Sequence, residues 1–445
     1  MAGIRAGAAR VVITPPVGIP MWGFANRALP SQSVHDELTA TALVIDDGSR
    51  QIGIVALDII ALDSWHVTAI RQRVEEVTGI SADHLLLSCS HTHSGPLPWR
   101  GRGHEELVRP YCDNLTNQIA GALDWAVRQL RPARLGFGRG TVQIQVNRRE
   151  RRPDGTTVIG VNPHGPVDPE VTVVRIDAED GSPLAALIGY ACHPVILGPR
   201  SYTLSADFVG RMRQVFEAAT GCPCLYLQGC TGNLNPLGGV TDRYDNCARL
   251  GTILAGEAIR VYGEALPVPG DSLAARRRSF DLPLAPLPPL AEVEAEIAAL
   301  RERLGTLEAE RAPALIVENA RFALRRAERV REEVAAGRTH QTIPFEVQAL
   351  RLGDVAIVAA PAELFVEIGL AIKERSPFPR TLALGYANGC IGYVPVAEAY
   401  PEGGYEVEQA HKGYGQLAAV APTAANAIIG VAFDLLGQLH GNGQQ

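Results

Sequence analysis

Two histidines separated by a single residue stand at the end of an apolar run. The stretch "LLLSCSHTHSGP" places His91 and His93 directly after Leu85–Leu87, a run typical of a buried strand. Side chains at positions i and i+2 of a strand point to the same side, so the two imidazoles can face one point in space. Two imidazoles are costly to bury without a metal ion or a hydrogen-bond partner. The spacing therefore indicates a site for a metal ion or a reacting substrate.

Further apolar runs end in residues that can bind a metal ion. His193 follows "LIGYAC", Glu363 follows "VAIVAAPA", and Tyr393 and then Tyr405 follow "LALGYANGCIG". Functional residues of open α/β sheets collect beyond the strand ends. Each residue also has a structural interpretation: His193 as a satisfied core histidine, Glu363 as a carboxylate in the first turn of a helix, and Tyr393 as a packing residue. Taken together, the imidazoles, the carboxylate and a fourth oxygen donor form a sensible zinc shell, and the same ligand types suit iron or manganese.

The elements that must position these residues alternate between two kinds. Apolar runs such as "QIGIVALDII" and "PCLYLQGC" alternate with segments of helical periodicity such as "SADFVGRMRQVFEAATG". This alternation predicts a layered α/β domain with helices flanking the sheets. The pair "ALVIDDGSRQIGIVALD" reads as a hairpin with a "DDGS" turn, so we expect mixed β-sheets and not purely parallel ones.

Residues 286–338 differ in composition from the rest of the chain. They are rich in Ala, Glu, Leu and Arg, and two segments of helical periodicity are separated by a break at Ala312–Pro313. This pattern predicts an antiparallel helical hairpin inserted into the domain. Charged helix faces are ordinarily solvated, so we expect a solvated arm, or a contact for a homo-oligomer, in preference to a catalytic role.

The overall composition excludes several classes of function. The 445 residues carry a net charge of −7, which leaves no basic surface for nucleic acid. No uncharged apolar run reaches the roughly 18 to 20 residues of a membrane span, and the N-terminus has no apolar signal segment, so we expect a cytoplasmic protein without a stable membrane anchor. The eight cysteines lack the spacing of a disulfide framework.

Six motifs, in this order, resemble the catalytic domain of the neutral/alkaline (non-lysosomal) ceramidases: "VVITPPVG", "MWGFA", "SHTHSGP", "YACHP", "PAELF", and "GYANGCIGYVP" followed by "GGYE". The resemblance spans nearly the whole chain apart from the hairpin. It implies that residues 1–445 form a single catalytic domain without the C-terminal immunoglobulin-like domain of that family. It also implies a zinc-dependent hydrolase that cleaves the amide bond of a small-molecule N-acyl substrate with a metal-activated water.

The resemblance also implies roles for individual residues. The implied zinc ligands are His91, His193, Glu363 and Tyr393. The implied catalytic and substrate-contacting residues are His93 at the substrate carbonyl, Arg148, Tyr393, Tyr405, and the backbone of Gly23. A zinc ion lowers the pKa of its water toward roughly 7, and hydrogen bonds from His93, Arg148 and Tyr405 could stabilise the oxyanion that forms on attack of an amide or ester carbonyl.

One loop departs from the family pattern. The segment "GNLNPL", beginning at Gly232, has Asn235 where the ceramidases have a serine important for activity. Asn235 could hydrogen-bond a substrate, but a tight glycine-rich turn lining the site is the favoured interpretation. We therefore expect an acyl amide smaller or more polar than ceramide. Hydrolysis of an ester or lactone is an alternative, and so is a non-catalytic relative that binds only a metal or ligand.

Overall fold

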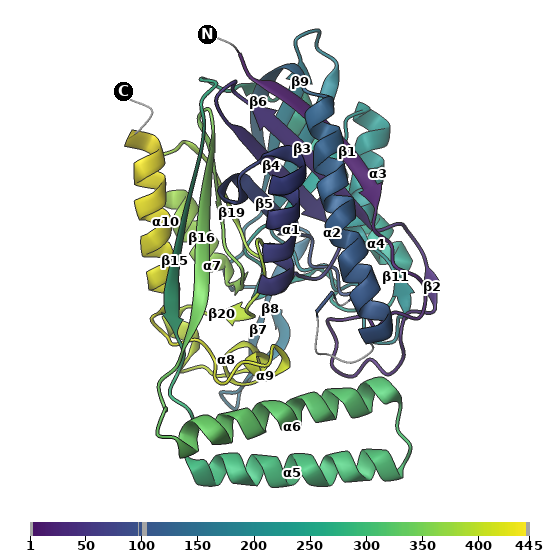
Figure 1. Ribbon diagram of the computed structural model, residues 1–445, viewed down its shortest axis with the longest axis vertical. Helices are drawn as coiled ribbons and strands as arrows, with labels where there is room; N and C mark the ends of the chain where they lie inside the picture. Colours follow the sequence, from purple (N-terminus) through teal and green to yellow (C-terminus); the bar gives the residue numbers. More distant parts are fainter. Residues whose placement is uncertain (1–2, 97, 100–104, 442–445) are drawn as a thin grey trace.

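The computed structural model describes residues 3–96, 98–99 and 105–441 (Figure 1). Within these residues the largest sheet has nine strands, in the order β12-β10-β9-β6-β1-β3-β4-β5 with β14 paired to β6. Its strands have these bounds: β1 (Arg5–Val12), β3 (Thr39–Asp46), β4 (Gln51–Leu57), β5 (Leu85–Cys89), β6 (Arg131–Thr141), β9 (Glu170–Ala178), β10 (Pro183–Tyr190), β12 (Cys224–Gln228) and β14 (Leu266–Pro267). The pairs β4–β5 and β10–β12 are parallel and the other pairs are antiparallel.

The turn between β3 and β4 shows why the sheet is mixed. Asp47 accepts hydrogen bonds from the backbone N–H groups of Ser49 and Arg50, at 2.8 and 2.7 Å. Gly48 has a φ of +85°, a conformation that glycine adopts without steric cost. The two strands therefore fold back as an antiparallel pair, with Asp46 opposite Gln51. The expectation of mixed sheets in an α/β domain is confirmed.

A second sheet packs on the first. It runs β15-β16-β17-β19, with these bounds: β15 (Leu273–Pro283), β16 (Thr342–Leu352), β17 (Val355–Ala359) and β19 (Arg380–Leu384). Along β3, Leu43 and Ile45 join one apolar cluster with Leu350 and Ile357 of the second sheet. The alternate residue Val44 joins a different cluster beneath the helices, as the two-residue period of a strand requires.

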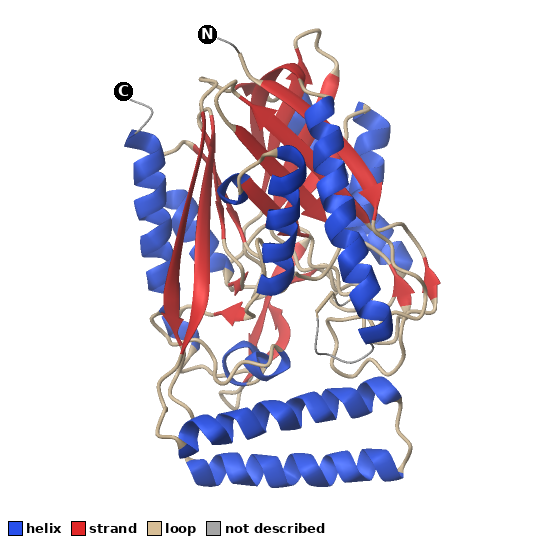
Figure 2. Ribbon diagram, in the orientation of Figure 1, coloured by secondary structure: helices blue, strands red, loops and turns tan. Residues whose placement is uncertain are grey.

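Helices cover the outer faces of both sheets (Figure 2). On the first sheet lie α1 (Ser64–Thr78), α2 (Glu105–Arg128), α3 (Asp207–Thr220) and α4 (Tyr244–Gly263). On the second sheet lie α7 (Val366–Glu374) and α10 (Ala424–Gly441). The order of layers is therefore helix, sheet, sheet, helix. No helix in the described part of the chain is both long and apolar enough to cross a membrane.

Except for η1, which precedes β5 at the opposite end, the remaining elements surround one end of the two sheets. They are β2 (Ser33–Val34), η1 (Ala82–His84), β7 (Gln145–Arg151), β8 (Thr157–Asn162), β11 (Thr203–Leu204), β13 (Leu234–Pro236), β18 (Glu363–Leu364), β20 (Tyr393–Val394), η2 (Ala397–Ala399), α8 (Tyr405–Glu408) and α9 (Ala410–Gly413). The short strands β18 and β20 pair with each other, and β13 pairs with β7.

Two helices form a hairpin between β15 and β16, at the bottom of Figure 1. They are α5 (Leu290–Ala309) and α6 (Ala314–Ala335). Val293 and Ile297 of α5 pack with Ala327 and Val330 of α6 in the same apolar cluster that contains the core of the second sheet. The hairpin is therefore attached to the body through a continuous apolar contact.

Candidate metal centre and active site

Three buried histidines meet beyond the ends of β5 and β10. The Nε2 atom of His93 lies 3.2 Å from Nε2 of His91 and 3.1 Å from Nε2 of His193. The three side chains are 8%, 1% and 0% exposed, respectively. The structure therefore brings together the three histidines selected from the sequence.

The reason for this convergence differs from the one expected. The strand β5 ends at Cys89, and His91 has a φ of +66°, so the pair does not lie on one face of a strand. The chain turns at His91 instead, while its backbone N–H donates to the carbonyl of Ile59. A left-handed conformation at a non-glycine residue is sterically unfavourable and is found frequently at functional sites.

The other ring nitrogens distinguish two of the histidines from the third. Nδ1 of His91 lies 2.7 Å from the carbonyl oxygen of Ile60, and Nδ1 of His193 lies 3.1 Å from that of Thr231. A ring N–H that donates to a carbonyl leaves the lone pair of Nε2 directed at the centre, which is the arrangement of metal-binding histidines. Nδ1 of His93 faces the backbone of Gly23 and makes no hydrogen bond of good geometry among the described residues, so no carbonyl fixes the tautomer of this ring.

Gly23 holds the ring of His93 in place by lying directly against it. A Cβ atom at Gly23 would lie 2.4 Å from Nδ1 of His93, closer than any real contact, and the φ of Gly23 is +107°. The ring of Phe24 meets the same imidazole edge to face at 5.0 Å. Only glycine fits between this loop and His93.

Glu363 places a carboxylate beside the histidines. Its Oε2 atom lies 3.4 Å from Nε2 of His91 and 3.7 Å from Nε2 of His193. The hydroxyl of Tyr386 lies 3.3 Å from Oε2, and the hydroxyl of Tyr414 donates to Oε1. Glu363 belongs to β18, and α7 begins only at Val366, so its alternative role in the first turn of a helix is wrong.

The loop at Gly232 supports the backbone of Glu363. The N–H of Gly232 donates to the carbonyl of Leu364 at 2.8 Å, and a Cβ atom at Gly232 would lie 2.5 Å from the carbonyl oxygen of Glu363. Residues 232 and 233 form a turn, as favoured from the sequence, and Asn235 follows in β13. Oδ1 of Asn235 lies 3.5 Å from Nη1 of Arg148.

Tyr393 and Arg148 lie next to this carboxylate. Tyr393 is paired with Glu363 in register across β18 and β20, so the two side chains leave the same face. Nη2 of Arg148 donates to the hydroxyl of Tyr393 at 2.9 Å. Glu406 accepts from Nε of Arg148 at 2.8 Å and from Nη1 of Arg149 at 2.9 Å. One buried carboxylate therefore orients two buried guanidinium groups.

Tyr405 connects this interior with the surface. Its side chain is 40% exposed, and its ring lies 5.8 Å from the ring of Tyr393. Burial raises the pKa of Tyr405 to about 12 and raises the pKa of Tyr393 as well, so both phenols are protonated at neutral pH. Both hydroxyl groups can therefore donate hydrogen bonds.

The charge state of the cluster suits a divalent metal ion. Burial, followed by the charge of His91, lowers the pKa values of His93 and His193, which keeps these imidazoles neutral. Burial opposes ionisation of Glu363, but His91, the hydrogen bond from Tyr414 and Arg148 outweigh it and lower its pKa. The neutral imidazole of His193 and the ionised carboxylate of Glu363 are in the protonation states that metal binding requires. The donors on His91, His93 and His193 lie within 4.8 Å of one another, which fits one ion.

Several residues of this site were missed from the sequence. They are Arg149, Thr231, Tyr386, Glu406 and Tyr414. Tyr386 lies within a motif noted from the sequence, and its ring packs 4.1 Å from that of His91 while its hydroxyl accepts from Thr231 at 2.7 Å. A buried tyrosine hydroxyl needs a hydrogen-bond partner, but the spacing of residues in the sequence does not show which residue that partner is. Glu406 lies within the motif "GGYE" but had no role assigned to it, and Tyr414 follows no apolar run, so the sequence carried no signal for Tyr414.

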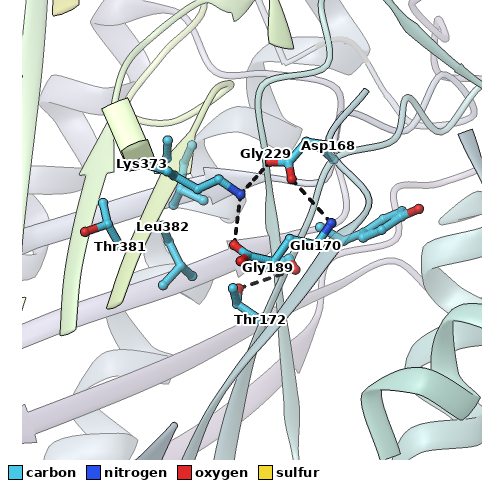
Figure 3. Close-up of a pocket in the computed structure, with 12 residues that line it drawn as sticks. Asp168, Glu170, Thr172, Gly189, Gly229, Lys373, Thr381 and Leu382 are labelled. Carbon is cyan, nitrogen blue, oxygen red and sulfur yellow. Dashed lines mark hydrogen bonds and ion pairs between the residues drawn. The ribbon is translucent and has the colours of Figure 1, made fainter. Parts of the chain in front are cut away.

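A separate small cavity is lined by residues of β9 and β10 in the first sheet, of β19 in the second sheet, and of α7 (Figure 3). The amine of Lys373 lies 2.7 Å from Asp168 and 2.8 Å from Glu170, so one cation faces two carboxylates there. Its volume of about 20 Å³ holds little more than one water molecule. This cavity is therefore too small for an organic substrate.

Comparisons with known proteins show which family and fold this chain resembles. Residues 5–225 match the family described as neutral/alkaline non-lysosomal ceramidase, N-terminal. The neutral ceramidase of Pseudomonas aeruginosa is 22% identical over 449 residues, which cover 87% of this chain and 66% of that protein. Neutral ceramidase B of Dictyostelium discoideum is 24% identical over 222 residues, which cover 46% of this chain and 30% of that protein. The matches thus span less than two thirds of either relative.

Two solved structures share the fold. One is a crystal structure analysis of neutral ceramidase from Pseudomonas aeruginosa, with a TM-score of 0.73, and the other is a ceramidase complexed with C2, with a TM-score of 0.75. Each is 20% identical and covers 99% of this chain, which in turn covers 75% and 76% of those chains. The resemblance stated from the motifs is confirmed. The chain belongs to the neutral/alkaline non-lysosomal ceramidase family.

Proposed function

We propose that this protein is a zinc-dependent hydrolase that cleaves the amide bond of an N-acyl substrate. The observation that carries the proposal is the convergence of the Nε2 atoms of His91, His93 and His193 beside the carboxylate of Glu363. In a chain of the ceramidase family, this donor set supports metal-assisted hydrolysis. We assign His91, His193 and Glu363 as ligands because their ring and carboxylate partners direct lone pairs at one point, and we assign Tyr393 as the fourth.

The residues around this set have distinct tasks in the proposed reaction. A bound zinc ion supplies Lewis acidity that activates water and polarises a carbonyl group. His93 donates from Nε2 to the substrate carbonyl oxygen, and Arg148 and Tyr405 stabilise the negative charge that develops on it. Donors fixed in advance in a site of low dielectric are worth several kcal/mol of barrier. Tyr386 and Tyr414 hold the two oxygens of Glu363 and so fix the direction of its lone pairs.

We further propose that the substrate is an acyl amide smaller or more polar than ceramide. The curated relatives are named neutral ceramidases, which supports an N-acyl amide as the substrate class. Asn235 contacts Arg148, so the residue at the family's serine position faces the side chains that would bind the carbonyl. A side-chain amide there presents a bulkier group than a hydroxyl. Hydrolysis of an ester with the same acyl group is the second activity to expect.

Metal analysis together with a substrate panel tests the proposal. The purified protein is analysed for metals and assayed on N-acetyl and N-hexadecanoyl sphingosine, small N-acyl amines and the matching esters. We expect about one zinc ion per chain and faster cleavage of the short acyl amides. Zinc bound without turnover of any amide would instead favour a protein that only binds the metal or a ligand.

A further inference from the structure

The helix α6 contacts two loops that carry residues of the candidate metal centre. We name residues 22–27 the N-terminal loop and residues 414–417, which follow α9, the C-terminal loop. The N-terminal loop holds Gly23 against His93, and Arg27 in the same loop donates to the carbonyl of His93 at 2.9 Å. The C-terminal loop carries Tyr414, which donates to Glu363. The hairpin therefore lies against both sides of the site, and not away from it as a solvated arm would.

Arg326 of α6 makes the most buried of these contacts. Its side chain is 5% exposed, and it donates from Nε to the carbonyl of Gln416 and from Nη2 to the carbonyl of Leu417, both at 2.7 Å. Nη1 lies 3.5 Å from the carboxylate of Glu296 in α5. Burial lowers the pKa of Arg326 despite this carboxylate, which reflects the cost of removing the guanidinium group from water. Two short charge-assisted bonds to backbone carbonyls offset that cost and fix the loop.

The neighbouring contacts leave the C-terminal loop little freedom. Gly415 has a φ of +73°, and a Cβ atom there would lie 2.6 Å from the ring of Phe322 in α6. The side chain of Gln416 donates to the carbonyl of Ile391, two residues before Tyr393. On the other side of Gly415, the ring of Tyr414 packs 5.6 Å from that of Trp99. The position of Tyr414 is thus defined by the residues that follow it.

We propose that Arg326 is a positioning residue for the metal centre. It fixes the carbonyls of Gln416 and Leu417, these hold Tyr414, and the hydroxyl of Tyr414 orients the carboxylate of Glu363. This inference deepens the proposed function, because it rests on Glu363 as a ligand of the metal. Asn319 of α6 strengthens the arrangement on the opposite side, since its Nδ2 donates to the carbonyl of Ala25 in the N-terminal loop at 3.1 Å.

The test compares Arg326→Met with Arg325→Met in the full-length protein. Arg325 precedes Arg326 in α6, but its side chain is 50% exposed and pairs only with Glu318 on the same helix among the contacts of the described residues. The affinity for Zn²⁺ is measured by competition with a chelator, and the visible absorption of the Co²⁺-loaded protein reports the ligand geometry. We expect Arg326→Met to bind Zn²⁺ about tenfold more weakly, with an altered Co²⁺ spectrum. We expect Arg325→Met to match the wild type.

A double-mutant cycle with Tyr414→Phe tests the proposed route. If Arg326 acts through Tyr414, the change at Arg326 causes no further loss of Zn²⁺ affinity once the Tyr414 hydroxyl is absent. Independent, additive losses would overturn the proposal, and so would equal affinities and spectra for Arg326→Met and Arg325→Met. Arg326→Lys, which retains one donor to the loop, enters the same cycle if Arg326→Met does not fold. A wild-type protein that binds no divalent ion refutes the metal centre itself, a result distinct from the other two.

Discussion

The carboxylate of Glu406 provides the sharpest test of how this interior is held together. It is 3% exposed and accepts from Arg148 and Arg149, whose side chains are also buried. Replacing it with Gln retains the shape but removes the charge and turns one acceptor oxygen into a donor that faces a guanidinium group. Breaking a buried ion pair by removing one partner costs about 3 to 5 kcal/mol. We expect a loss of this size in the free energy of unfolding of Glu406→Gln.

The matched control is Glu402→Gln, because Glu402 contacts the same Arg149. Its carboxylate lies 3.3 Å from Nη2 of Arg149 and is 40% exposed, so its loss costs less than about 1 kcal/mol. Thermal unfolding measures both. With an unfolding entropy of roughly 2 cal/mol/K per residue, about 4 kcal/mol lowers the Tm by about 4 °C if the chain unfolds as one unit. A Glu406→Gln protein as stable as Glu402→Gln would refute the view that one buried carboxylate holds both arginines.

Three further predictions concern the metal, the substrate and pH. His91→Ala should lose the metal and activity together, whereas His93→Ala should retain zinc by elemental analysis and lose turnover. Asn235→Ser should raise the rate of ceramide cleavage relative to short acyl amides, and an unchanged preference would contradict the role of this position. Burial, followed by two cations, lowers the pKa of His411 to about 4. The unfolded chain binds this proton at about 6.5, so stability falls between pH 6.5 and 4, by at most about 3 kcal/mol, and His411→Gln should flatten this part of the stability profile. The charged groups around His411 are Arg326, Lys412 and Glu296.

The sequence predicted a turn or helix correctly where neighbouring residues alone determine it. The turn between β3 and β4 depends only on Asp47 and Gly48. The carboxylate of Asp47 accepts the hydrogen bonds of the turn, and Gly48 adopts the positive φ that the turn requires. The helical hairpin likewise follows from composition and a break at Pro313. In each case the signal and the structure lie within a few neighbouring residues.

The site itself was only partly accessible from the sequence. His91 and His93 were selected for a strand geometry that does not exist, since the chain turns at His91, which has a left-handed conformation. Glu363 resembled a residue of the first helical turn because the helical periodicity of α7 begins at Ala362 in the sequence, four residues before the helix begins in the structure. The pairs of Arg149 with Glu406 and of Glu363 with Tyr414 join residues 257 and 51 positions apart, which no periodicity can encode.

The donors of the candidate metal centre lie far apart in the sequence. His91 and His193 follow strands of the first sheet, whereas Glu363 lies just after β17 of the second. During synthesis on the ribosome, His91 and His193 are therefore made long before Glu363, the carboxylate that completes the set of donors. Loading of the ion should accordingly be one of the last events in the biogenesis of this protein, after the two sheets have closed on each other.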